Sequence, residues 1–234
     1  MTGPVLAKTY PAPFVDRKEI LRYMGCRGGR ANEAHKTDSA LESMIDECLS
    51  ELLPQLTYNV CYRQFTIYVD ACNCNLSFMQ TDSRALAGAL DGCERLVVFA
   101  ATIGLAPDRL ISKYGRLSPA RALCFQAIGA ERIESLCTSF NNDIACSLRQ
   151  EGYFTRPRFS PGYGDFPLAA QKDIFRVLDC ERRLGLSLND SLLMSPSKSV
   201  TALIGAAAGE KPDCSRNAQN NCRTCNDKDC PFRR

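Results

Sequence analysis

The sequence predicts an α+β fold in a single domain, followed by a cysteine-rich tail. Several segments have strand character and several have helical periodicity, but the two kinds do not alternate strictly as they do in βαβ proteins. No repeat of 20–50 residues is visible. With 234 residues, 45% of them hydrophobic and 24% charged, the chain can bury a substantial core.

The first quarter of the chain predicts two helices and a strand. Residues 1–16 contain three prolines and are expected to form an extended lead-in. Asp16 to Gly25 reads as a short helix, capped by the aspartate and stopped by the glycine. Apolar residues three and four apart predict a second helix, from Asp38 or Ser39 to Pro54.

Alternating apolar residues over Tyr58–Val69 predict a strand, and a slip of the pattern between Tyr62 and Phe65 indicates a bulge or two short strands. Arg95–Gly104 is an apolar run bounded by turns and is expected to be a buried strand. The remaining expected elements are helices at Ser83–Leu90, Pro107–Tyr114, Ser118–Arg149 and Pro167–Leu184, a loop at 151–167, and short strands at Leu192–Met194 and Ser199–Ile204. Residues 17–208 form the predicted domain, and 209–234 the tail.

Composition excludes several classes of protein. His35 is the single histidine, so a multi-histidine zinc site or a His-Glu-x-x-His protease is impossible. The net charge of +3 includes no basic stripe of the kind that binds nucleic acid. No secretory leader and no apolar stretch of about 18 residues is visible, so no membrane association is expected. The prediction is a cytoplasmic protein with reduced thiols.

The loop at Arg156–Pro167 is the first candidate for chemistry. Pro161 and Gly162 suit the two central positions of a type II turn, where glycine accepts a positive φ. Such a turn can present backbone groups to a ligand. Arg158 could hold a carboxylate through two parallel hydrogen bonds, and Tyr163 could lay its ring against a cation or a purine. The alternative is an ordinary connection between two helices.

The tail is the second candidate, since four cysteines lie within its last 21 residues. These four thiolates could chelate one ion or cluster, and metal binding would supply the folding energy that a segment with few large apolar residues lacks. The spacing leaves an iron–sulfur cluster and zinc both open, and free or disulfide-forming thiols are the alternative. The candidate ligands are Cys214, Cys222, Cys225 and Cys230.

The other cysteines are expected to act mainly as small apolar core residues. Cys72 and Cys74 could add metal ligands, but packing is the favoured interpretation. His35 is expected at the surface, because no Gly-x-Ser-x-Gly elbow or phosphate-binding glycine motif accompanies it. The expected core thiols are Cys26, Cys48, Cys61, Cys93, Cys124, Cys137, Cys146 and Cys180.

Several motifs, in order, resemble the reactivation domain of cobalamin-dependent methionine synthase. They are Arg158-Phe-Ser-Pro-Gly-Tyr163, Leu184-Gly-Leu186 and Met194-Ser-Pro-Ser-Lys-Ser-Val200. Upstream, Glu19–Gly25, Tyr62-Arg63, Ala101–Gly104 and Asp108-Arg-Leu110 are similar to shorter, free-standing versions of that domain. The resemblance covers residues 17–205 and implies a twisted, mainly antiparallel sheet flanked by helices.

This resemblance implies that the chain binds S-adenosylmethionine and repairs a corrinoid in the inactive cob(II)alamin state. One electron reduces the cobalt, and the sulfonium methyl group then passes to cob(I)alamin. Carried over from the family, Arg158 would bind the methionine carboxylate, the backbone of Ser160 and Gly162 would contact the ligand, and Tyr163 would flank it. A second segment, represented by Ser195, Lys198 and Ser199, is expected to line the same cleft.

The partners follow from the same resemblance. The chain lacks the Asp-x-His-x-x-Gly element that donates a histidine to cobalt, so cobalamin is expected on a separate methionine synthase subunit. A tail cluster could deliver the electron, or the basic residues of the tail could dock a flavodoxin- or ferredoxin-like donor. The sequence leaves two alternative functions open. One is a metal-cluster redox activator of another corrinoid protein, and the other is a non-catalytic docking module.

Overall fold

The computed structural model describes residues 3–26, 39–70 and 73–209. Its centre is a five-stranded sheet with the order β1-β2-β6-β10-β7, in which every neighbouring pair is antiparallel. These strands are β1 (Leu6–Thr9), β2 (Asn59–Thr66), β6 (Arg95–Thr102), β7 (Tyr153–Thr155) and β10 (Ser199–Ala208). The predicted α+β class and antiparallel sheet are confirmed.

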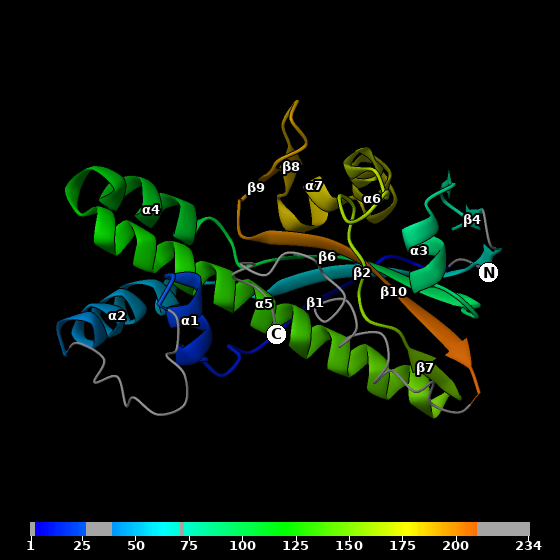
Figure 1. Cartoon of the computed structure of the whole chain (residues 1–234), viewed down its shortest axis with the longest axis horizontal. Helices are drawn as coiled ribbons and strands as arrows, with labels where there is room; N and C mark the ends of the chain where they lie inside the picture. Colours follow the sequence, from blue (N-terminus) through cyan, green and yellow to red (C-terminus); the bar gives the residue numbers. More distant parts are fainter. Residues whose placement is uncertain (1–2, 27–38, 71–72, 210–234) are drawn as a thin grey trace.

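Helices flank the sheet, and very short strands lie at its periphery (Figure 1). The helices are α1 (Arg17–Tyr23), α2 (Ser39–Leu52), α3 (Arg84–Ala89), α4 (Ala106–Leu117), α5 (Pro119–Gln150), α6 (Gln171–Leu178) and α7 (Cys180–Leu184). The short strands are β3 (Tyr68–Val69), β4 (Cys74–Asn75), β5 (Gln80–Thr81), β8 (Ser187–Leu188) and β9 (Met194–Ser195).

Strand β6 is apolar from Leu96 to Ala101 because both faces of the sheet are covered. Val97, Phe99 and Ala101 face α5, where they pack with residues such as Phe140. Leu96, Val98 and Ala100 face α3, α6 and α7. Figure 1 shows α5 crossing one face of the sheet, with α3, α6 and α7 on the opposite side.

A third apolar cluster lies beside the sheet, where α1, α2 and α4 pack around the first half of α5. Ile20, Ile45 and Phe125 are fully buried in it. In Figure 1 these helices extend past one end of the sheet, so α5 belongs to both the sheet core and the helical cluster. Within the described ranges, no helix is long and apolar enough to cross a membrane.

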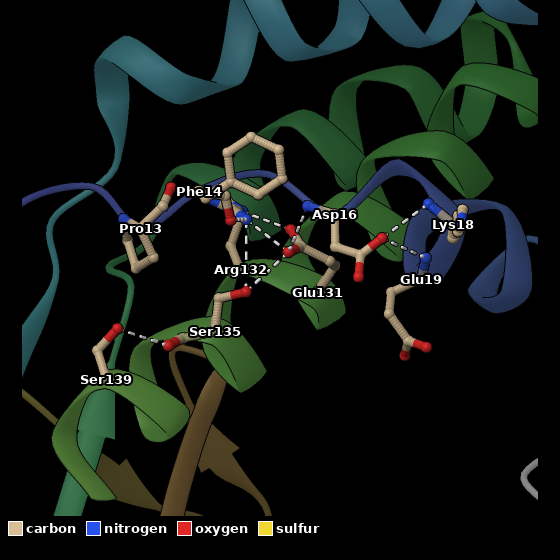
Figure 2. Close-up of polar contacts among 9 residues, drawn as sticks. All are labelled: Pro13, Phe14, Asp16, Lys18, Glu19, Glu131, Arg132, Ser135 and Ser139. Atoms are coloured by element: carbon tan, nitrogen blue, oxygen red, sulfur yellow. Dashed lines mark hydrogen bonds and ion pairs between the residues drawn. The ribbon is translucent and has the colours of Figure 1, made fainter. Parts of the chain in front are cut away.

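A buried polar network fastens the N-terminal segment to α5 (Figure 2). Arg132 and Glu131 form an ion pair with side chains only 0% and 2% exposed. The Arg132 guanidinium donates to the carbonyl oxygens of Pro13 (2.7 Å) and Phe14 (2.6 Å). The Glu131 carboxylate accepts the Asp16 N–H at 3.1 Å. The network therefore links the lead-in and the start of α1 to the long helix.

The predicted ends of α1 are confirmed. The Asp16 carboxylate accepts the N–H groups of Lys18 (2.9 Å) and Glu19 (3.3 Å), so it caps the helix as expected. Gly25 follows the helix with φ +82°, a left-handed conformation that suits glycine. The second predicted helix is α2, which ends at Leu52. A 3₁₀ turn at Leu53–Gln55, which contains Pro54, follows it directly.

The structure corrects three sequence predictions, which concern the lead-in, the strand at Tyr58–Val69 and the helix at Pro167–Leu184. The lead-in contains the edge strand β1, which sequence reasoning missed because all four of its residues are exposed. Strand β2 runs through Tyr62–Phe65 without the predicted slip, and the break comes at Ile67. The predicted helix at Pro167–Leu184 is a 3₁₀ turn plus α6 and α7, separated by Asp179 with φ +53°.

The strands at the C-terminal end also differ from prediction. The strand predicted at Leu192–Met194 is β9, shifted to Met194–Ser195 and paired with β8. Strand β10 continues past Ile204 to Ala208. Its Ala- and Gly-rich end has low intrinsic strand propensity, but small residues fit there because a Cβ on Gly205 would lie 2.7 Å from Cys93 Sγ. Tertiary packing, rather than propensity, extends the strand.

Most of the expected core cysteines are buried, which confirms the prediction for Cys48, Cys61, Cys93, Cys124, Cys137 and Cys180. Cys74 is buried as well. Cys26 and Cys146 are exposed, so the prediction was wrong for these two. Cys26 follows the end of α1, and Cys146 lies on the solvent side of α5. His35 and Cys72 lie outside the described residues.

Candidate functional site

The candidate loop contains the predicted type II turn. The Tyr163 N–H donates to the Ser160 carbonyl at 3.3 Å, with Pro161 and Gly162 between them. Gly162 has φ +91°, as the third position of this turn requires. Its N–H donates to the Phe166 carbonyl at 2.8 Å, so this group already has a partner within the loop. Any ligand contact from the Gly162 backbone would therefore come from its carbonyl oxygen.

The loop is fixed to the edge of the sheet. The Arg156 N–H donates to the Gly205 carbonyl (2.8 Å), and Phe159 and Leu203 exchange two hydrogen bonds of 2.8 Å. These bonds continue the β7–β10 pairing beyond the end of β7. The segment that carries Arg158 is thus held by backbone hydrogen bonds as a strand would be. This pairing fixes the position of the Arg158 backbone.

Asp165 fastens the other side of the loop to α3. Its carboxylate accepts the Ser83 hydroxyl and the N–H groups of Arg84 (2.9 Å) and Ala85 (3.1 Å) at the start of that helix. The hydrogen bond from Ser83, followed by those from Ala85 and Arg84, lowers the pKa of the Asp165 carboxyl. A negative charge at a helix N-terminus is favourable. The loop is consequently anchored at both ends.

Arg158 forms an ion pair with Glu134 of α5. The Arg158 side chain is 26% exposed and the Glu134 side chain 43% exposed, so solvent reaches the pair. The contact uses Nη2 of the arginine, and a guanidinium has five N–H donors. Sequence reasoning missed Glu134 because it is one acidic residue on a long helix, and no local pattern shows that it faces a loop 24 residues away.

Tyr163 presents its ring to solvent, with the residue 67% exposed. The ring lies 6.3 Å from the Phe159 ring, centroid to centroid, at an interplanar angle of 57°. Phe159 lies at the same centroid distance from the buried Phe166. The exposed Tyr163 ring therefore belongs to a row of aromatic rings that reaches the buried Phe166.

The second predicted segment contributes differently at each residue. Ser199 is buried, and its hydroxyl lies 2.9 Å from Thr102 Oγ1 and 2.8 Å from the Pro196 carbonyl. The Ser199 hydroxyl therefore already has two hydrogen-bond partners within the protein. Ser195 lies in the peripheral β8–β9 pair and is exposed. Lys198 is partly buried and is considered next.

The stem of Lys198 crosses Gly129 of α5, where an added Cβ would lie 3.0–3.2 Å from three of its methylene carbons. Burial lowers the pKa of the Lys198 ammonium, and Asp108 partly offsets this effect. The Asp108 carboxylate also accepts the Ser197 N–H at 3.0 Å, which ties the segment to α4. Glycine at position 129 gives the lysine stem room to reach the helix.

Both predicted segments contact helix α5, at positions five residues apart and therefore on different sides of the helix. Lys198 packs on Gly129 and Arg158 pairs with Glu134, and these helix positions are separated by about 7.5 Å along the axis. An open cavity of about 420 Å³ lies elsewhere, lined by residues that include Gly3, Leu6 and Arg95. None of the predicted site residues lines that cavity.

The predicted metal ligands Cys214, Cys222, Cys225 and Cys230 lie outside the described residues. Among residues 3–26, 39–70 and 73–209, no group of three or more His, Cys, Asp or Glu side chains could hold a metal ion. Among the described cysteines, Cys48 and Cys124 are buried in the cluster beside the sheet, and Cys61 and Cys180 are buried between the sheet and α3, α6 and α7.

Comparisons with known proteins point to one family. Residues 140–212 match the model of the vitamin B12 dependent methionine synthase activation domain, a range that contains both the loop and the Ser195–Ser199 segment. The structure is similar to that of the MetH reactivation domain bound to AdoHcy, with a TM-score of 0.63 and 15% sequence identity over 89% of this chain and 80% of that one. No curated protein sequence matches.

The match to the family model covers the C-terminal part of the chain, whereas the structural similarity extends over most of it. The two comparisons agree with the resemblance drawn from the sequence motifs. Residues 140–212 therefore resemble a vitamin B12 dependent methionine synthase activation domain, and the chain as a whole has the fold of the MetH reactivation domain.

Proposed function

We propose that this chain binds S-adenosylmethionine at the Arg158–Tyr163 loop and helps to reactivate cobalamin-dependent methionine synthase. The observation that carries the proposal is the Arg158–Glu134 pair beside the anchored turn. Arg158 and the turn lie within the range that matches the activation-domain family, and Glu134 lies before it. The solved structure with the same fold has AdoHcy bound, a ligand that differs from S-adenosylmethionine by one methyl group and its charge.

The chemistry of the ligand fits these side chains. S-adenosylmethionine carries a carboxylate, an ammonium, a sulfonium and an adenine ring. Arg158 keeps donors for a second carboxylate beside Glu134. Glu134 offers a negative charge to one of the two cationic groups, and the exposed ring of Tyr163 offers a face to the adenine or the sulfonium. We include Ser160, Gly162 and Lys198 in the proposed site and give Ser199 a structural role at its edge.

Calorimetric titration with S-adenosylmethionine tests the site. Arg158→Ala should weaken binding roughly ten- to hundredfold, because it removes charge-assisted hydrogen bonds to the carboxylate. Arg156→Ala is the matched control, since this neighbouring guanidinium donates to the Asp91 carbonyl instead. Absence of binding by the wild type would refute the proposal. Equal binding by wild type and Arg158→Ala would refute only the assignment of the site.

We further propose that cobalamin is carried by a separate methionine synthase subunit, and that a flavodoxin- or ferredoxin-like protein supplies the electron in the cytoplasm. The chain would act as a methyltransferase component only with that partner. The test mixes a partner loaded with cob(II)alamin, a reductant and S-adenosylmethionine, and follows the visible spectrum. Methylcobalamin should form only when this chain is present. Equal formation without it would contradict the proposed role.

The tail cysteines Cys214, Cys222, Cys225 and Cys230 are proposed to hold an iron–sulfur cluster or zinc. Their support is the sequence spacing alone. Anaerobic purification followed by iron and zinc analysis and a visible spectrum distinguishes the two. Broad cluster absorbance with iron supports a redox role, and stoichiometric zinc without that absorbance supports a structural one. Protein with neither metal would contradict chelation.

A further inference from the structure

The exposed face of α4 carries positive charge and no negative charge. Arg109, Lys113 and Arg116 are exposed on this helix, and none of its exposed residues is acidic. Spacings of four and three residues make these cations neighbours along one side of the helix. The single acidic residue of α4 is Asp108, and its carboxylate accepts the Ser197 N–H at 3.0 Å. The helix therefore presents a cationic face to solvent.

Ion pairs within the chain do not neutralise this face. Lys113 contacts Glu51 of α2 at 3.0 Å, but its side chain is still 52% exposed. Arg109 and Arg116 form no ion pair with any residue that the structure describes. Arg116 lies in the last turn of α4, where the helix dipole favours a cation, whereas Arg109 lies near the start, where the dipole does not. The stability of the helix therefore does not account for Arg109.

Apolar residues lie at both ends of the cationic face. Leu105, which precedes α4, is 42% exposed, and Leu117, its last residue, is 72% exposed. Protein interfaces combine apolar contacts of this kind with charged groups. The hydrogen bond between Asp108 and Ser197 joins α4 to the segment that contains Lys198. Because α4 also extends past the end of the sheet, a partner could reach this face beside the proposed site (Figure 1).

We propose that the α4 face, which consists of Leu105, Arg109, Lys113, Arg116 and Leu117, docks an acidic, flavodoxin-like electron donor. Charge complementarity favours this occupant, because opposite charges attract the two proteins before contact and accelerate their association. Arg109 and Arg116 are about 10 Å apart along the helix axis, a distance that a compact acidic patch on a small protein can match. This role rests on the proposed function, which needs an electron for cobalt, and it adds the surface that receives the donor.

Binding of a purified flavodoxin with negative net charge tests this surface. Fluorescence anisotropy of the dye-labelled flavodoxin gives its Kd for the full chain at about 25 mM and about 300 mM salt. Replacing both Arg109 and Arg116 with glutamate should weaken binding roughly tenfold or more at low salt and remove most of the salt dependence. The matched control replaces Arg176 and Arg182 of α6 and α7, which are 73% and 80% exposed, and makes the same change in net charge. Equal weakening by the two double variants would overturn the proposal.

Cross-linking of the wild type tests the same surface without a variant. The flavodoxin carboxyl groups are activated with a carbodiimide and N-hydroxysuccinimide, the excess reagent is removed, and the full chain is added. Lys113 is the single lysine of α4, and peptide mapping should find it linked to flavodoxin. Links confined to other lysines, such as Lys211 and Lys228 of the tail, would overturn the proposal, as would absence of flavodoxin binding.

The S-adenosylmethionine site is tested separately from the docking face. The double variant of Arg109 and Arg116 should bind S-adenosylmethionine with the Kd of the wild type in calorimetric titration, because neither side chain belongs to the proposed ligand site. Weak flavodoxin binding together with unchanged S-adenosylmethionine binding supports the docking role of α4. Loss of both in this variant would contradict a role confined to docking.

Discussion

Replacing Arg132 with methionine should strongly destabilise the protein. The change keeps a long side chain but removes the guanidinium, so the Glu131 carboxylate keeps its charge in a place where its side chain is 2% exposed. The carbonyl groups of Pro13 and Phe14 lose their donors at the same time. Removing one partner of a buried ion pair typically costs about 3–5 kcal/mol, most of it from the remaining charge.

Urea unfolding of wild type and variant measures this cost. At about 2–4 °C per kcal/mol for a chain of this length, the same change should lower Tm by roughly 6–20 °C. Arg176→Met is the control, because its ion pair with Asp173 lies at the surface, with the arginine side chain 73% exposed. An exposed pair of this kind contributes about 1 kcal/mol or less.

A second variant distinguishes the destabilisation caused by the unpaired Glu131 charge from the destabilisation caused by lost packing. Glu131→Gln combined with Arg132→Met removes the charge as well as the cation, while the amide can still accept the Asp16 N–H and the Ser135 hydroxyl. The double variant should recover part of the stability lost in Arg132→Met. If Arg132→Met costs no more than the surface control, or the double variant is as unstable as the single one, the buried network does not act as described.

Three further predictions concern the loop and the sheet. Asp165→Asn should destabilise the fold at pH 7, and this difference should shrink below about pH 4 in pH-dependent unfolding, because a carboxyl with a lowered pKa contributes only while ionised; a constant difference would contradict this. Gly205→Ala should cost about 1–3 kcal/mol in urea unfolding, since its Cβ would meet Cys93 Sγ at 2.7 Å, whereas Gly88→Ala, with open space, should be neutral or stabilising. Gly162→Ala should cost about 1–2 kcal/mol by the same measurement, owing to the left-handed φ; an unchanged midpoint would argue against that strain.

Local chemistry in the sequence predicts much of the fold. The cap at Asp16, the stop at Gly25 and the Pro161-Gly162 turn each depend on neighbouring residues, and the structure has all three. Strand β6 was also predicted, because a strand covered on both faces leaves a continuous apolar run in its interior. These features needed no knowledge of distant contacts.

The features that sequence reasoning missed depend on distant partners. Strand β1 is exposed along its whole length, so only its pairing with β2 identifies it. The pairing of Glu134 with Arg158 and the capping of α3 by Asp165 join residues that are 24 or more positions apart. The roles of Ser160, Gly162, Tyr163 and Lys198 stay predictions, although the loop and Lys198 both contact α5.

The direction of β10 sets a distance requirement for any redox group on the tail. Lys198 precedes the first residue of the strand, and the tail begins after its last residue, Ala208. A ten-residue strand is about 33 Å long, so the tail starts that far from the lysine. The 25 residues beyond Gly209 could span up to about 85 Å when extended. A tail group that acts near Lys198 would therefore have to bridge about the length of this strand.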